Sequence, residues 1–350
     1  MEKQLERRRE PEPVVYERNI EERWQHHKEE EELLASLPHV IKYESVTWKQ
    51  GGQAYRKGFT GGWISQRLDR VPLCTLALVE QILAPSLKSG KHRHFGEALF
   101  YIMEGEGYEI HDNVKYPWEA GDLMCVPTYC IHQHFNASTD RTARLFFSVP
   151  LAFQLCGLSL IEQMEMHSNY HPPEGAQLLY GSQGEIIGYR SANGEEVRFG
   201  AVDFDFQREM EAKKPFSVID KPANTYEHYI KNLTDQTKWR QSIPHVIKGK
   251  EVPWENTPMG RQQYYLSPYK PGPLLLYDAY IQEIPPGGRS GKHRHAFEEV
   301  HKILTGKGYD IHNEVKWEWE VEDVVCIPIN TVHQHFNADP RRPARFLSLQ

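Results

Sequence analysis

The sequence lacks the features that mark several other classes of protein. Its 350 residues contain no apolar run long enough to cross a membrane, and the charged N-terminal residues do not resemble a signal peptide. The five cysteines form no Cys-x-x-Cys pair, which disfavours a zinc ribbon and fits reduced thiols. The net charge of -7, with lysine and arginine dispersed along the chain, disfavours binding to nucleic acid. Together these absences predict a cytoplasmic protein that binds neither a membrane nor nucleic acid.

An internal repeat organises what the sequence does contain. The segment Gly-Lys-His-Arg-His at residues 90–94 returns at residues 291–295, an offset of 201 residues. The His-Gln-His segment that begins at His132 returns at the same offset. A period this long that occurs twice indicates two copies of one domain, expected at residues 37–152 and 241–350.

Each copy has the pattern of a series of short strands. Runs rich in Val, Ile, Leu, Phe and Tyr are separated by Gly, Pro, Asn and Asp, which is typical of a small antiparallel barrel or sandwich. In the first copy, strands are expected at residues 75–84, 99–103, 107–111, 124–127 and 144–149. The chain is therefore expected to be dominated by β-structure.

Helices are expected outside the two copies. The arm at residues 1–36 is strongly charged, and its part from 17 to 36 predicts a surface helix. The linker at residues 153–240 contains two stretches with a helical pattern, and the glycine-rich stretch between them predicts turns or a hairpin. These three stretches are residues 151–167, 225–240 and 181–200. Apolar residues on the arm and the linker predict a homo-oligomer.

Histidines spaced i, i+2 are the candidate metal ligands. Side chains alternate along a strand, so His92 and His94 are expected to face the barrel interior together while Arg93 faces out. His132 can add a third nitrogen from a distant strand, and His134 shares its face. Imidazole groups of this kind suit iron, manganese, nickel, copper or zinc. Structural roles are expected for His39, His111, His245 and His312.

The residues around these histidines resemble the two motifs of the cupin family. The second copy fits the motifs through His293, His295, Glu299, Gly306, Pro328, His333 and Asn337. The first copy fits them through His92, His94, Gly105, Gly121, Pro127, His132 and Asn136. The resemblance covers both copies and implies a bicupin, in which two antiparallel jelly-roll barrels are joined by a partly helical linker.

The two copies differ at the position of the family's glutamate ligand. Ala98 stands at this position in the first copy, and the neighbouring Glu97 is expected to face the other side of the strand. The second copy keeps Glu299. The resemblance therefore implies a first site of His92, His94 and His132, and a second site of His293, His295, Glu299 and His333. Where the family has glycine, this chain has Tyr129, Asn330 and Glu322.

Among bicupins, the first copy is most similar to the group of gentisate, salicylate and 1-hydroxy-2-naphthoate dioxygenases. The similarity lies in His92-Arg93-His94, Ala98-Leu99, residues 103–107 and His132-Gln133-His134. In that group the glutamate is also absent and three histidines hold Fe(II). The resemblance implies an Fe(II)-dependent, extradiol-type dioxygenase. Such an enzyme cleaves the ring of a hydroxylated aromatic acid or diphenol and inserts both atoms of dioxygen.

Further residues are candidates for the reaction itself. His134 is expected to donate a proton or a hydrogen bond to the substrate, or equally to orient His132. A carboxylated substrate needs a cationic partner, which Arg67 or Arg70 can supply, and the spacing selects neither. The roles of Glu97 and His335 stay open.

Two other functions remain alternatives. Oxalate decarboxylases use Mn(II) held by three histidines and a glutamate in both domains, a pattern that Glu299 fits and Ala98 does not. A decarboxylase of small carboxylic acids would then react in the second copy. The third function is a bicupin that holds a ligand through its metal without transforming it.

Overall fold

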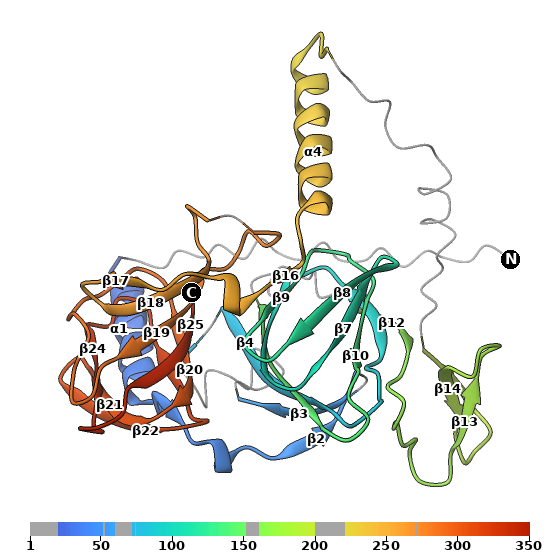
Figure 1. Cartoon of the computed structure of the whole chain (residues 1–350), viewed down its shortest axis with the longest axis horizontal. Helices are drawn as coiled ribbons and strands as arrows, with labels where there is room; N and C mark the ends of the chain where they lie inside the picture. Colours follow the sequence, from blue (N-terminus) through green and yellow to red (C-terminus); the bar gives the residue numbers. More distant parts are fainter. Residues whose placement is uncertain are drawn as a thin grey trace, which may run out of the picture. The chain divides into compact units, whose positions relative to one another are not determined.

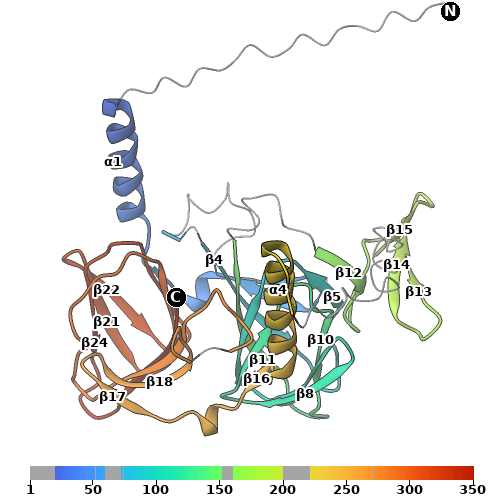
Figure 2. The same cartoon turned by 90° about the horizontal axis from the view of Figure 1, so that it is seen from above.

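The computed structural model describes residues 20–51, 53–59, 72–73, 75–151, 161–199, 221–270 and 272–350. The chain divides into two units, Met1–Leu37 and Pro38–Gln350. In the first unit, helix α1 (Ile20–Ser36) is the helix predicted for the arm, whose expected first residues, 17–19, lie outside the described residues (Figure 2).

The first copy forms two antiparallel sheets (Figure 1). The larger sheet has the strand order β16-β9-β6-β11-β4-β3-β2 and the smaller one β12-β5-β10-β7-β8. Strands β16 (Val246–Ile247) and β12 (Ile161–Glu165) come from outside the first copy. The strands of the larger sheet that come from the first copy are β2 (Trp48–Gln50), β3 (Tyr55–Gly58), β4 (Leu76–Leu83), β6 (Ala98–Glu104), β9 (Leu123–Val126) and β11 (Ala143–Pro150). Those of the smaller sheet are β5 (Lys91–His94), β7 (Glu106–His111), β8 (Val114–Glu119) and β10 (His132–Asn136). The five strands expected in this copy are confirmed as β4, β6, β7, β9 and β11.

The second copy repeats this arrangement. Its larger sheet has the order β1-β23-β20-β25-β19-β18-β17, in which β1 (Val40–Ile41) comes from the first copy, and its smaller sheet has the order β22-β21-β24. Within the second copy, the larger sheet contains β17 (Glu255–Thr257), β18 (Gly260–Leu266), β19 (Ala279–Ile284), β20 (Glu299–Thr305), β23 (Val324–Ile327) and β25 (Ala344–Leu349). The smaller sheet contains β21 (Lys307–His312), β22 (Val315–Glu320) and β24 (His333–Asn337). The prediction of a β-dominated chain with two barrels is thus confirmed.

The first strand of each copy pairs with a strand of the other barrel. Strand β1 (Val40–Ile41) pairs with β23 of the second barrel, and β16 (Val246–Ile247) pairs with β9 of the first. A short 3-10 turn follows each exchanged strand, at Tyr43–Ser45 and Gly249–Glu251. The exchange ties the two barrels together by backbone hydrogen bonds.

The exchanged segments also account for the contacts of four buried histidines. His39 Nδ1 lies 2.7 Å from His312 Nδ1, and the His39 ring stacks on Trp317. In the other barrel, His245 Nδ1 lies 2.7 Å from His111 Nδ1, and its ring stacks on Tyr116. The structural role predicted for these histidines is confirmed.

Strand β6 shows why the central strands are apolar along their whole length. Its residues Ala98, Phe100 and Ile102 belong to the core inside the first barrel. Its residues Leu99 and Tyr101 belong to a second core that contains side chains of both barrels. A strand buried on both faces needs a continuous apolar run. The same alternation in β20 places Val300 between the barrels and Ile303 inside the second barrel.

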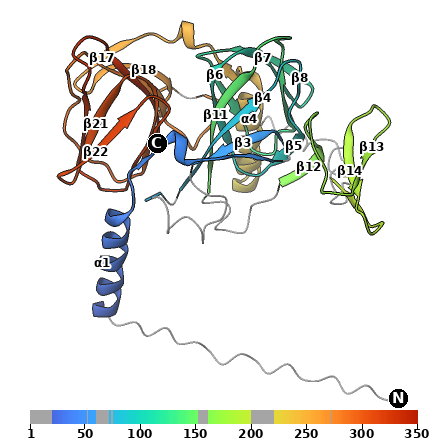
Figure 3. The same cartoon turned by 90° about the horizontal axis from the view of Figure 1, so that it is seen from below.

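The linker differs in part from its prediction. The helical pattern of residues 151–167 is wrong where the structure describes it, because Ile161–Glu165 form strand β12 and Leu151 lies in a bend; residues 152–160 lie outside the described residues. Strand β12 pairs with β5, as Figure 3 shows. The expected hairpin is a three-stranded sheet of β13 (Gln177–Tyr180), β14 (Ile186–Arg190) and β15 (Glu196–Arg198). The second expected helix is confirmed as α4 (Thr225–Ser242).

Three tight turns carry a non-glycine residue in a backbone conformation that favours glycine. Tyr129 has φ 62° and Asn330 has φ 60°, at the positions where the family motif has glycine. Glu322, with φ 74°, takes the place of Gly121, which has φ 92°. The turns therefore keep the shape that the motif requires.

No helix within the described ranges is long and apolar enough to cross a membrane.

Candidate metal centres

The first barrel brings three predicted ligands together. His92 and His94 lie on β5, and His132 lies on β10 directly opposite His92. A ligand atom of each residue lies within 4.8 Å of those of the other two. Arg93, between the two β5 histidines, points out of the barrel as expected, and it forms an ion pair with Glu162 on β12.

Backbone contacts fix which nitrogen of each histidine is free. His92 Nδ1 bonds to the Gly90 carbonyl at 3.1 Å, His132 Nδ1 to the Cys130 carbonyl at 2.9 Å, and His94 Nδ1 to the Gly96 carbonyl. A carbonyl accepts only, so each Nδ1 carries the proton and each Nε2 keeps its lone pair. His132 Nε2 is buried without a hydrogen-bond partner.

These three histidines are neutral in the absence of a metal. Burial is the largest factor, and it lowers the pKa of His92 and His132 well below the ordinary value and that of His94 to about 4. Three converging neutral imidazole nitrogens, each oriented by a backbone carbonyl, are a donor set that a divalent transition metal accepts. The residues of the first barrel therefore fit a metal ion.

His134 lies beside this group on the same face of β10. Its Nδ1 forms a hydrogen bond with Glu109 Oε2 on the neighbouring strand β7, and its ring lies 4.5 Å from that of Phe100. His134 Nε2 is buried without a hydrogen-bond partner. Burial, with a smaller contribution from Arg56, lowers the His134 pKa to about 3. The sequence motif identified His134, whereas Glu109 has no motif and was missed.

Arg56 is a second residue that the motifs missed. It lies on β3, its guanidinium stacks over Phe147 at 5.2 Å, and Nη2 donates to Gln81 Oε1 at 3.3 Å. Its Nε is shielded from solvent and has no hydrogen-bond partner, and no carboxylate pairs with it among the described residues. Burial lowers the Arg56 pKa to about 10, and its charge lowers the pKa values of His92, His94 and His134. The other candidates, Arg67 and Arg70, lie outside the described residues.

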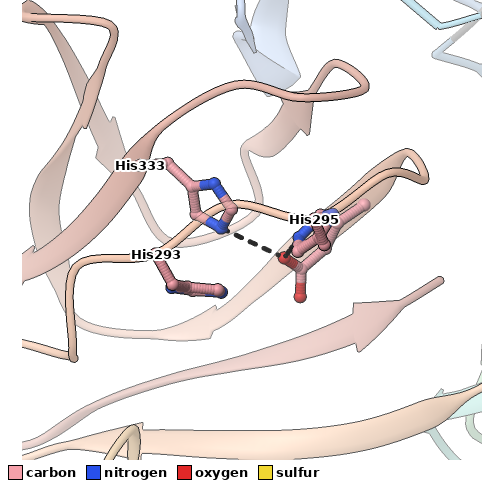
Figure 4. Close-up of side chains that lie close together, drawn as sticks. His293, His295 and His333 are labelled. Carbon is pink, nitrogen blue, oxygen red and sulfur yellow. Dashed lines mark hydrogen bonds and ion pairs between the residues drawn. The ribbon is translucent and has the colours of Figure 1, made fainter.

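The second barrel brings together all four of its predicted ligands. Figure 4 shows the rings of His293, His295 and His333 converging. Glu299 Oε2 lies 3.0 Å from His295 Nε2 and 3.5 Å from His333 Nε2. The Nδ1 atoms again bond to backbone carbonyls, of Gly291, Phe297 and Thr331. His333 Nε2 is buried without a hydrogen-bond partner, so this donor set also fits a divalent metal ion.

The glutamate position separates the two centres. Ala98 and Glu299 occupy matching places on β6 and β20, opposite Val126 and Ile327. Glu97 points away from the first centre, as expected, and accepts hydrogen bonds from the backbone N–H groups of Leu275 and Leu276. The first centre therefore offers nitrogen alone, and the second offers nitrogen and one carboxylate.

Comparison with known proteins identifies the class. The family model described as Cupin domain matches residues 79–149 and again residues 280–350. The chain thus contains two cupin domains and is a bicupin.

Relatives with assigned activities resemble parts of the chain. It is 29% identical to 5-aminosalicylate 1,2-dioxygenase from Comamonas over 68 residues, which are 19% of this chain and 18% of that protein. It is 20% identical to gentisate 1,2-dioxygenase from Haloferax over 278 residues, which are 79% of this chain and 70% of that protein.

Solved structures of two enzymes share the fold. A variant of salicylate 1,2-dioxygenase from Pseudoaminobacter salicylatoxidans in complex with gentisate has a TM-score of 0.53 at 15% identity, covering 96% of this chain and 92% of the other. A variant of Bacillus subtilis oxalate decarboxylase has a TM-score of 0.54 at 13% identity, covering 89% and 77%.

Proposed function

We propose that the first barrel holds Fe(II) through His92, His94 and His132 and uses dioxygen to cleave the ring of a hydroxylated aromatic acid or diphenol. The observation that carries this proposal is the buried Ala98 at the glutamate position, which leaves three neutral nitrogens and no carboxylate. Bound Fe(II) supplies open coordination positions for a chelating substrate and dioxygen and transfers electrons between them. The names of the relatives, 5-aminosalicylate and gentisate dioxygenase, support the same chemistry.

Arg56 is the residue that we assign to the substrate carboxylate. A partly buried guanidinium without an anionic partner is costly, and a carboxylate offers it a planar, two-oxygen acceptor. Its charge reaches the ligands His92 and His94 and also His134, so an anion bound there lies beside the metal position. This pairing favours an aromatic acid over an uncharged diphenol.

His134 is the residue that we assign to the substrate hydroxyl. Glu109 fixes its ring through Nδ1, so Nε2 is the atom free to exchange a hydrogen bond or a proton with the substrate. The rings of Phe100 and Phe147 stack at 4.7 Å next to His134 and provide an apolar wall that keeps water from this side of the reacting ring.

The second barrel supports a second candidate function. His293, His295, His333 and Glu299 fit Mn(II) or Fe(II), because a carboxylate oxygen adds a hard, anionic ligand to three imidazoles. A Mn(II)-dependent decarboxylation of a small carboxylic acid would take place at this centre.

We also propose that the protein acts as a homo-oligomer in the cytoplasm. Helix α4 exposes large apolar side chains, with Tyr226 68% and Tyr229 59% exposed. Tyr226 and Tyr229 are three residues apart on the helix and therefore neighbours on one face, and a contiguous exposed apolar patch is typical of a surface that contacts another protein.

Dioxygen uptake by apoprotein loaded anaerobically with Fe(II) tests the function. The panel contains gentisate, salicylate, 1-hydroxy-2-naphthoate, catechols and hydroquinones, and oxalate with Mn(II) is run in parallel. The proposal predicts equimolar consumption of dioxygen and one aromatic acid, with the absorbance of a ring-opened product. Carbon dioxide from oxalate without any aromatic turnover would favour the second barrel as the reactive one.

A further inference from the structure

The Glu299 carboxylate has two oxygens with different surroundings. Oε2 faces the histidines of the second centre, at 3.0 Å from His295 Nε2. Oε1 accepts hydrogen bonds from Tyr280 Oη at 2.7 Å, from Ser348 Oγ, and from Gln350 Nε2 at 2.9 Å. We call these three donor residues the Glu299 cradle. Glu299 itself is 1% exposed, so water does not replace these donors.

Strand register explains how the cradle forms. Tyr280 on β19 lies directly opposite Ser348 on β25, and Ser348 lies opposite His301 on β20. Glu299 and His301 are two residues apart on β20, so their side chains share the inner face. Gln350 Nε2 also donates to Tyr280 Oη at 3.1 Å, which fixes the tyrosine hydroxyl in turn.

The first barrel has an apolar residue at each matching position. The offset of 201 residues places Val79 at the position of Tyr280, Phe147 at that of Ser348, and Val149 at that of Gln350. Phe147 pairs with Val79, as Ser348 pairs with Tyr280. The second barrel thus combines a glutamate with three hydrogen-bond donors, and the first barrel combines an alanine with three apolar side chains. A buried carboxylate stays ionised only where donors replace its hydration, so the two sets are chemically consistent units.

Glu299, His301 and His335 form a third group whose possible ligand atoms lie within 4.8 Å of one another. This group fits a separate metal ion less well than the second centre does. His301 Nε2 lies 3.1 Å from Glu299 Oε1, but this oxygen already accepts three hydrogen bonds. An ion bound here would have to displace donors from Oε1, whereas Oε2 is open to the three histidines of the second centre.

We propose that Tyr280, Ser348 and Gln350 are positioning residues that fix Glu299 as a one-oxygen ligand of a metal in the second barrel. The cradle keeps Oε2 directed at His293, His295 and His333 and slows the loss of the ion from the second centre. This inference rests on the proposed binding of a metal by the second barrel, and it is independent of ring cleavage in the first.

The test isolates the second centre in a His132→Ala background, which removes a ligand of the first. The protein is loaded with Mn(II), and the metal content, the electron paramagnetic resonance spectrum and the rate of Mn(II) loss to a chelator are measured. Adding Tyr280→Phe and Ser348→Ala is expected to raise the dissociation rate by about 10- to 100-fold. The spectrum is expected to change, because Glu299 is free to rotate. Circular dichroism verifies that the variant is folded.

Two further variants separate the cradle from general packing. Ser348→Thr, with the native Tyr280, keeps a hydroxyl at this position. Its Mn(II) is expected to dissociate as slowly as that of the His132→Ala protein with the native cradle. Tyr264→Phe removes a neighbouring hydroxyl that is bonded to Gln262 instead, and is expected to leave the rate unchanged.

An unchanged dissociation rate and spectrum in Tyr280→Phe/Ser348→Ala would overturn the proposed role of the cradle. Two ions bound in the second barrel would also overturn it, in favour of a bridging Glu299. A His132→Ala protein that binds no Mn(II) would overturn both the cradle and the second centre. None of these results bears on dioxygen uptake by the first barrel, which the substrate panel tests separately.

Discussion

A single side chain sets the chemical difference between the two centres. Ala98 leaves the first centre with three neutral ligands, so a divalent ion there would keep its full charge and attract an anionic chelating substrate. Glu299 cancels part of that charge in the second centre. His301, with smaller contributions from His295 and His333, outweighs the burial of Glu299 and holds its pKa well below the ordinary value.

Arg56 gives the residue-scale prediction. Arg56→Gln removes the cation that we assign to the substrate carboxylate, and is expected to raise KM for an aromatic acid by about 10- to 100-fold, because a hydrogen bond to a charged group is lost. Steady-state kinetics with metal-loaded protein measure this change. Arg261→Gln, which alters an exposed arginine paired with Glu283, is the matched control. An unchanged KM in Arg56→Gln would remove Arg56 from the substrate site.

The sequence could predict the ligands but not Arg56 or the cradle. His92, His94 and His132 stand out because i, i+2 spacing and repetition leave a pattern in the chain. Arg56 has no such pattern, since its surroundings arise when β3 pairs with β4 and β4 pairs with β11, which carries Phe147. Tyr280 and Ser348 likewise meet Glu299 only through the register of β19 with β25.

At the scale of elements, strand β12 covers the edge of β5, the strand that carries two ligands of the first centre. Its backbone pairs with β5, and Glu162 lies opposite Arg93, between the two β5 histidines. The apolar and Glu/Gln-rich composition of residues 151–167 predicted a helix. The edge of β5 supplies backbone partners that local preference does not encode, so residues 161–165 form a strand. The matching segment at residues 291–295 forms only an isolated bridge, between His293 and His333.

Glu162→Gln tests the contribution of β12. The substitution leaves the buried Arg93 without its anionic partner on β12, and is expected to destabilise the fold by about 1–3 kcal/mol. It is also expected to accelerate metal loss from the first centre, because β5 loses part of its support. Denaturant unfolding and chelator kinetics measure the two effects. Glu318→Gln, which alters an exposed pair with Lys316, serves as the control. Metal loss as slow as in the native protein would show that β12 does not hold the first centre in place.

At the scale of the whole molecule, the two barrels share one core. Leu99 and Phe146 of the first barrel belong to the same apolar cluster as Val300 and Leu347 of the second. Arg144 of the first barrel bonds to Glu80 and also to Glu322 of the second, and the buried Lys302 lies 2.8 Å from Glu322. The exchange of β1 and β16 adds backbone pairing. The repeat predicted two copies, but these contacts between copies have no signal in the spacing of motifs.

One measurement tests the central claim, that ring cleavage takes place in the first barrel. Dioxygen uptake with the best aromatic acid of the panel is recorded for the native protein and for His132→Ala, both loaded with Fe(II), and metal content is determined in the same samples. We predict that His132→Ala loses uptake while the second barrel keeps its metal. Uptake by His132→Ala at the native rate, with its metal held only by the second barrel, would contradict the account.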